Sequence, residues 1–154
     1  LQQLAARGGG VRVAFGKPRY AEGDAMTVEL RSAAAGYLHV LSVGPDGVPL
    51  VLLPNGQHRA QRVAAGAALT LPTPAMSIGF SAGRPFGATL VAAIVTREPV
   101  DLHALADGEH DDEGRLRDVV GRLSQAGVLK LRAAAAQAAG SAVVRVCPPA
   151  GACR

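Results

Sequence analysis

Turn-forming residues interrupt the first hundred positions at short intervals, and this spacing limits what the chain can fold into. The clearest stretch covers residues 45–72 and reads PDGVPLVLLPNGQHRAQRVAAGAALTLP. It holds two residue pairs that tolerate the left-handed backbone of tight turns, Asp46 with Gly47 and Asn55 with Gly56. The apolar runs between such turns are too short for stable helices and have the length of β-strands. We therefore expect short strands joined by tight turns.

Two of the apolar runs are apolar on both faces, which is typical of strands that are covered on both sides. They are residues 36–43 (GYLHVLSV) and 87–97 (GATLVAAIVTR). Residues 25–32 (AMTVELRS) instead alternate between apolar and polar, as a half-buried antiparallel strand does. With the remaining runs, about seven short strands are expected. The pattern predicts a mainly β fold, an antiparallel β-sandwich that is either immunoglobulin-like or a partly open barrel.

After Pro99 the pattern changes to one that indicates helix. Apolar residues recur at helical spacing behind an acidic cluster: Leu116, Val119, Val120 and Leu123 follow Asp111, Asp112 and Glu113. Acids favour a helix N-terminus, and Gly127 would end this helix. The alanine-rich residues 128–140 predict a second helical segment, and residues 141–147 a last strand. We expect one or two C-terminal helices, within about residues 112–139, packed on the sheet.

The length of 154 residues fits a single domain. We assign residues 1–10 (LQQLAARGGG) to a linker or the end of a preceding segment, 11–147 to the domain and 148–154 to a tail. Because the sequence does not open on methionine, we expect it to be a piece of a longer protein. Its apolar runs are far shorter than the roughly 20 residues of a membrane-spanning helix, so no span is expected in this segment.

Charge and aromatic content bear on the class of partner. A net charge of +4 permits contact with acidic partners, yet the basic residues are scattered rather than gathered in a stripe. The chain has two tyrosines, three phenylalanines and no tryptophan, which is poor material for the base-stacking platforms of nucleic-acid-binding proteins. We therefore expect no nucleic-acid partner.

Two cysteines, Cys147 and Cys153, lie close together in VCPPAGACR at the end of the chain. They could close a small disulfide loop if the turn between them brings their Cα atoms within about 7 Å. Such a loop would suit an oxidising compartment. Two unpaired thiols in a tail are the alternative.

No grouping of residues predicts a catalytic or metal site. His39, His58, His103 and His110 do not stand at zinc-ligand spacing, and the acidic residues 107–113 depart from the calcium-loop pattern. Neither a GxSxG elbow nor a nucleotide-binding glycine motif is present. We expect His39 to be a packed residue at the edge of the core and His58 a solvated loop residue. No cofactor, metal or enzymatic activity is predicted.

Several motifs between Tyr20 and Pro99, taken in order, resemble a bacterial family of unknown function, DUF4384. In this sequence they are Tyr20 with Gly23 and Asp24; Gly36 and Tyr37; Asp46 and Gly47; Leu53, Pro54 and Asn55; Ala65, Gly66 and Pro72; and Pro85, Phe86 and Gly87. Leu53 stands where an aromatic residue is common in the family. The C-terminal helical segments and the cysteines lie outside these motifs.

The resemblance implies an accessory β domain rather than a catalyst. Such domains look like appendages of bacterial kinases and caspase-like peptidases and parts of cell-envelope proteins, some near type VI secretion genes. We expect a non-catalytic binding module of a larger envelope protein, periplasmic, with a protein partner favoured over a cell-wall component. The alternative is a regulatory or substrate-reading domain of a cytoplasmic Ser/Thr kinase or caspase-like peptidase.

Recognition commonly uses loops on a rigid β frame, so the candidate binding surface is the turn after the hairpin. Its residues are Asn55, Gln57, His58, Arg59 and Arg62, with Arg84 as an additional member.

Overall fold

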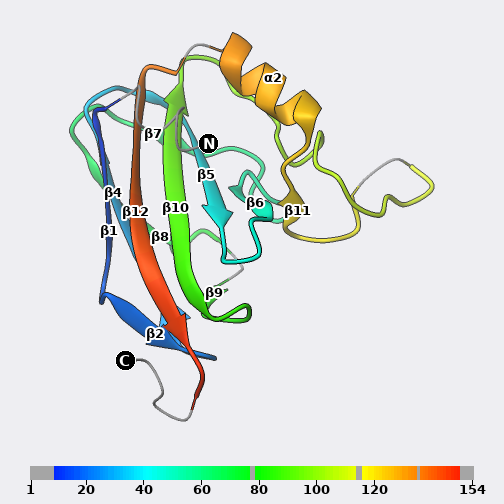
Figure 1. The fold of residues 1–154 in the computed structure, drawn as a ribbon. Coiled ribbons are helices and arrows are strands. Elements are labelled where there is room, and N and C mark those ends of the chain that lie inside the picture. The colour runs from blue at the N-terminus through cyan, green and yellow to red at the C-terminus, as the bar shows by residue number, and fades with distance from the viewer. Residues whose placement is uncertain (1–8, 77–78, 114–115, 135, 150–154) are drawn as a thin grey trace.

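The computed structural model describes residues 9–76, 79–113, 116–134 and 136–149 and shows a mainly β fold (Figure 1). The elements are β1 (Val11–Phe15), β2 (Arg19–Ala21), β3 (Ala25–Met26), β4 (Val28–Ser32), β5 (Gly36–Val43), β6 (Pro49–Leu53), β7 (Arg62–Val63), β8 (Ala68–Leu71), β9 (Phe80–Ser81), β10 (Gly87–Thr96), β11 (Gly121–Arg122), α2 (Gln125–Ala133) and β12 (Ala138–Cys147). Within this part of the chain no helix is long and apolar enough to cross a membrane.

The largest sheet has the strand order β11-β6-β5-β10-β12-β2, and β7 pairs with β5 outside this path. Neighbouring strands are antiparallel except β12 and β2, which are parallel. The two strands predicted to be central, β5 and β10, lie side by side at its middle and pair from Leu90 with Val43 to Thr96 with Tyr37. Their burial on both faces confirms that prediction.

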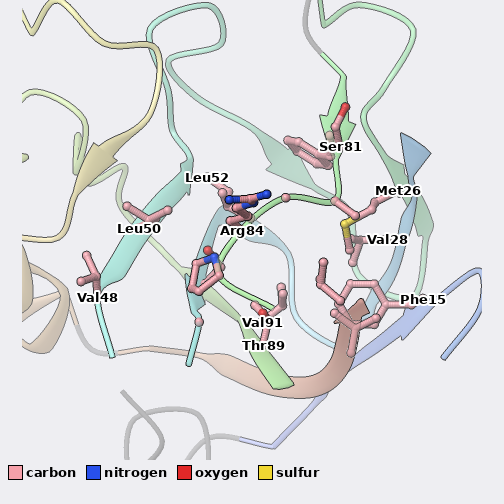
Figure 2. A pocket seen from close by; sticks show the side chains of 18 of the residues that line it. Phe15, Met26, Val28, Val48, Leu50, Leu52, Ser81, Arg84, Thr89 and Val91 are labelled. Carbon is pink, nitrogen blue, oxygen red and sulfur yellow. The ribbon is translucent and has the colours of Figure 1, made fainter. Parts of the chain in front are cut away.

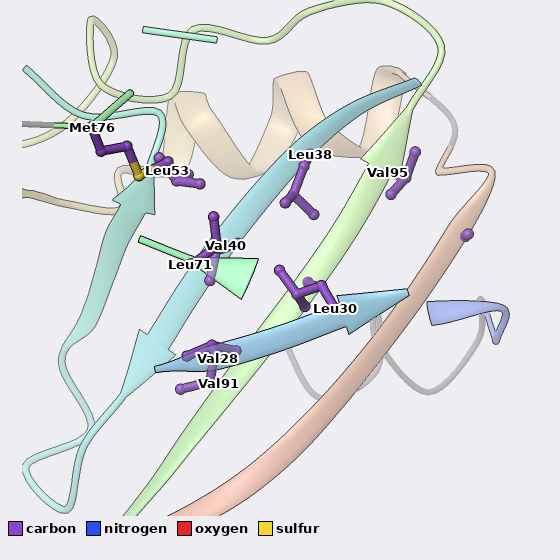
Figure 3. Packing of buried hydrophobic residues seen from close by; sticks show 11 residues of the cluster. Val28, Leu30, Leu38, Val40, Leu53, Leu71, Met76, Val91 and Val95 are labelled. Carbon is purple, nitrogen blue, oxygen red and sulfur yellow. The ribbon is translucent and has the colours of Figure 1, made fainter. Parts of the chain in front are cut away.

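A second, three-stranded sheet of order β1-β4-β8 packs against one face of the large sheet (Figure 3). Alternate residues of each strand point into the space between the sheets, because successive side chains of a strand leave opposite faces. The buried residues there are Val28, Leu30, Leu38, Val40, Leu53, Leu71, Met76, Val91, Ala93, Val95 and Ala138. This cluster is the main hydrophobic core.

The other face of the large sheet is covered by α2 and by the segment after β10. Leu41, Val51 and Ile94 point to this side, and they pack against Leu102 and Leu131. The three-stranded sheet covers one face of β5 and β10, and α2 with the segment after β10 covers the other (Figure 1). This explains why both strands are apolar on both faces.

The prediction of a helix over Leu116 to Leu123 is wrong. Leu116 forms an isolated bridge with His110, and β11 pairs with β6 at the edge of the large sheet. One helix is present in the described residues, and it begins at Gln125, where the Ser124 hydroxyl accepts a hydrogen bond from the backbone N–H of Gly127 (3.0 Å). Gly127, predicted to end a helix, thus lies in the first turn of α2.

The second predicted helical segment, residues 128–140, is only partly helical. Helix α2 ends at Ala133, and β12 begins at Ala138. Residues Ala138 and Ala139 are buried against the sheet and pair with β10. A strand buried on both sides can consist of small residues, so the alanine content did not distinguish it from a helix.

Two glycines assigned to the N-terminal linker join the sheets. The carbonyl of Gly9 accepts from the N–H of Ala139 (2.8 Å), and the carbonyl of Gly10 accepts from the N–H of Ala33 (2.7 Å). The ordered pairing thus starts before Val11.

Candidate functional site

Asn55, predicted as a binding residue, is buried within its own turn and is 0% exposed. Its side-chain amide donates to the carbonyl of Leu52 (2.9 Å), and its side-chain oxygen accepts from the N–H groups of Gln57 (2.9 Å) and His58 (2.8 Å). All of these bonds hold the chain as it leaves β6. Asn55 therefore shapes the turn, and its side chain faces its own loop rather than solvent.

The neighbouring predicted residues do lie together at the surface. Gln57 and Arg59 are exposed and His58 is half-buried, its ring nitrogen 2.9 Å from the side-chain oxygen of Gln61. The Arg59 guanidinium forms an ion pair with Asp101, and the Arg62 guanidinium lies over the Tyr37 ring, 5.3 Å from its centroid. A hollow of about 310 Å³ lies beside them, lined in part by Tyr37, Arg59 and Asp101.

Two buried histidines lie behind this surface. His39 is 2% exposed, and its two ring nitrogens face the carbonyl oxygens of Ile94 (3.3 Å) and Val100 (3.2 Å). Burial lowers the pKa of His39, although the two carbonyls oppose this. The pKa of His103 is lowered too, first by burial and then by the charge of Arg59. The prediction that His39 is a packed residue at the edge of the core is confirmed.

Arg84 lies at the other end of the large sheet. Arg62 lies opposite Tyr37, which in turn lies opposite Thr96, the last residue of β10. Arg84 instead comes shortly before Gly87, the first residue of β10. The ten residues of β10 span about 30 Å. The structure thus separates Arg84 from the other predicted binding residues.

At the Arg84 end, the two sheets part and leave an apolar pocket of about 390 Å³ (Figure 2). One wall is formed by Val48, Leu50 and Leu52 of β6 and the hairpin before it, and the opposite wall by Phe15, Met26 and Val28. Further lining comes from Thr89, Val91, Val144 and Val146 of β10 and β12.

The ionisable groups that line this pocket are exposed. Among the described lining residues, the ionisable side chains are Asp46 and Arg84. The Asp46 carboxylate accepts from the N–H of Val48 (3.1 Å). The Arg84 guanidinium is mostly exposed, lies 5.5 Å from the centre of the Phe86 ring and forms a long ion pair with Glu22 (3.6 Å). The rim therefore carries charges of both signs around an apolar interior.

Sequence reasoning missed this pocket, although it included Arg84. The lining residues come from strands far apart in the sequence, so no local spacing marks them. The one available signal was that the strand after the Asp46 turn, β6, carries apolar residues on both faces.

Cys147 is disulfide-bonded and lies at the end of β12. The partner predicted for it, Cys153, lies outside the described residues. In the part of the chain that the structure describes, no group of three or more histidine, cysteine, aspartate or glutamate side chains is arranged to hold a metal ion.

Comparison with known proteins gives one match. A family model described as "Domain of unknown function (DUF4384)" matches residues 19–99. No curated protein and no solved structure matches the chain. The matched residues run from β2 to just beyond β10 and include both the Asn55 turn and the larger part of the pocket lining.

Proposed function

The chain belongs to the DUF4384 family, and from the pocket that the matched segment helps to form we propose that it is a non-catalytic binding module of a larger bacterial cell-envelope protein. Family membership alone does not carry this function, because a fold can host unrelated activities. The observation that carries it is the apolar pocket between the two sheets at the Arg84 end.

The chemistry of the pocket favours a protein partner that inserts apolar side chains. Its volume of about 390 Å³ lies within the range of binding sites for small ligands or a few side chains. An apolar centre with a charged rim is also the usual arrangement of a protein interface. Cell-wall sugars would need many hydrogen-bonding groups, whereas the walls are mainly apolar, so the proposal favours a protein over a wall component.

For the frame that holds this pocket, we favour a sandwich over a partly open barrel. The main core fills the space between β4 and β8 on one side and β5 and β10 on the other, as in two sheets packed face to face. The immunoglobulin-like class stays a proposal.

The disulfide bond of Cys147 supports the envelope placement, because disulfides persist in oxidising compartments such as the periplasm. Thiol alkylation and mass spectrometry of protein taken from its native host, without reductant, test this placement. We expect no free Cys147 thiol. A fully reduced cysteine would favour the alternative, a regulatory or substrate-reading domain of a cytoplasmic kinase or peptidase. The association with type VI secretion rests on the resemblance alone.

Photo-crosslinking in the native host tests the binding site. A photoreactive residue placed at Val48, on the pocket wall, is expected to give a discrete protein adduct, and Leu50→Glu should reduce that adduct at least tenfold by charging the wall. Leu129, which is 65% exposed on α2, supplies the matched control. A crosslinker at Leu129 should give no such adduct, and Leu129→Glu should leave the Val48 adduct unchanged.

Two results would overturn the proposed site. Adduct formation that survives Leu50→Glu in a protein with an unchanged melting temperature would show that the pocket is not used. The second result is loss of the adduct in the double variant Arg59→Glu/Arg62→Glu but not in Leu50→Glu. It would show that the partner binds at the opposite end of the sheet.

A further inference from the structure

Two arginines stand directly opposite each other on the outer face of the three-stranded sheet. Strands β1 and β4 are antiparallel, and their register pairs Arg12 with Arg31. The flanking residues Val11, Val13 and Leu30 pack into the core, so the two arginine side chains leave the opposite face toward solvent. Both are exposed. Like charges directly opposite each other on neighbouring strands are destabilising.

In the described part of the chain no acidic group forms an ion pair with either arginine. Neither guanidinium lies within 4.0 Å of a carboxylate among the described residues. The nearest acid on this face by register is Glu29, which stands opposite Ala14 and diagonal to Arg12, and it forms no ion pair with either arginine. On its other side Arg31 pairs with Ala68, which is too small to cover it.

The space beside the two arginines is open and lined by small residues. A wide surface hollow of about 720 Å³ is bordered by Arg12 and Arg31 together with Gly10, Ala33 and Gly66. Because glycine has no side chain and alanine has only a methyl group, a ligand has room to approach both guanidinium groups. This hollow shares no lining residue with the apolar pocket.

We propose that Arg12 and Arg31 form a binding site for a phosphate monoester group. Each guanidinium offers a planar pair of N–H donors that matches two oxygen atoms of an oxyanion. Two arginines together can therefore bind more acceptor oxygens than the two that a carboxylate has. A phosphate monoester has three such oxygens. Its charge of nearly −2 at neutral pH also balances the two positive charges.

The first test follows the melting temperature in inorganic phosphate, with sodium chloride adjusted to keep the ionic strength constant. We expect about 3 °C of stabilisation at 50 mM phosphate in the wild type, because a ligand that binds the folded state raises its stability. Arg12→Gln and Arg31→Gln should each lose most of this increment. Each should also melt about 1–3 °C higher than the wild type without phosphate, since the repulsion is removed.

Arg97→Gln is the matched control, because Arg97 is an exposed arginine outside this hollow and loses the same charge. It should keep the full phosphate increment, which separates site binding from the general stabilisation that phosphate gives to most proteins. Equal increments in the wild type and in Arg31→Gln would overturn the proposal. So would an equal loss in Arg97→Gln.

A second measurement locates the ligand and identifies its source. Phosphate titration followed by NMR should shift the side-chain signals of Arg12 and Arg31 and the amides of Gly10 and Gly66, and shifts confined to other residues would contradict the site. Co-sedimentation with vesicles that contain phosphatidic acid, compared with phosphatidylcholine alone, distinguishes a lipid headgroup from a soluble phosphate ester. Arginine-dependent binding to the former vesicles assigns the lipid, and its absence alongside a positive phosphate titration assigns the soluble ester.

Discussion

Asn55 illustrates at the residue scale how a turn residue can resemble a binding residue in the sequence. Its position in a polar loop suggested contact with a partner, but its three side-chain hydrogen bonds all close the turn. The sequence identified the turn itself, because asparagine before glycine is a local signal. It could not show the direction of the side chain, which depends on where the carbonyl of Leu52 lies.

Replacing Asn55 by alanine should therefore destabilise the domain rather than only weaken binding. The change removes the bond to Leu52, leaves the N–H of Gln57 without its acceptor and leaves the N–H of His58 with only its longer bond to the Asn55 carbonyl (3.3 Å), which should cost about 2–3 kcal/mol. Urea unfolding measures this loss. Asn55→Asp keeps the acceptor and should cost less than Asn55→Ala. Equal stability of Asn55→Ala and the wild type would contradict the structural role.

His39 makes the stability depend on pH. Burial lowers the pKa of His39 in the folded state below its ordinary value of 6.5, so the unfolded chain binds a proton more readily. The contribution of neutral His39 to the free energy of unfolding is therefore complete above about pH 6.5 and is lost as the pH falls toward the folded-state pKa. His103, whose pKa is also lowered, contributes in the same direction. Urea midpoints at pH 7.5 and 5.5 should show a smaller decline in His39→Gln than in the wild type. An equal decline in both would exclude a contribution from His39.

At the scale of elements, the segment before α2 shows how tertiary pairing overrides helical spacing. Leu116 to Leu123 have the periodicity of an amphipathic helix, yet Gly121 lies so close to Ala106 and Leu116 that a Cβ atom there would stand 2.4 and 2.6 Å from their side chains. Glycine also weakens a helix interior. Pairing of β11 with β6 satisfies the backbone at the sheet edge instead.

Strand β12 depends on a glycine where β1 crosses close to it. A Cβ atom on Gly140 would lie 1.9 Å from the carbonyl oxygen of Val11, which is backbone and cannot rotate away. Gly140→Ala should therefore push β1 away from β12 and cost about 1–3 kcal/mol, measured by thermal unfolding. At Gly83 an added Cβ atom meets nothing within 4 Å, so Gly83→Ala should be nearly neutral. Similar losses in the two variants would contradict the close approach.

At the scale of the whole molecule, the two-sided burial of β5 and β10 should make them the most stable part of the fold. One core covers them from the three-stranded sheet and another from α2. Native-state hydrogen exchange should therefore be slowest at the amides of Val40, Leu41, Ala93 and Ile94, and fastest in the short strands β3 and β9. Faster exchange in β5 than in β9 would contradict a central role for this pair.

The sequence by itself determined the β class, the positions of the turns and the two central strands. Glycine, proline and asparagine set backbone geometry locally, and apolar residues on both faces of a short run require cover on both sides. Only the tertiary structure decided that residues 116–124 are not helical, that Arg84 lies at the opposite end from Arg59, and that Arg12 faces Arg31. These outcomes depend on which strands pair and in which register, and register is fixed by contacts between residues far apart in the chain.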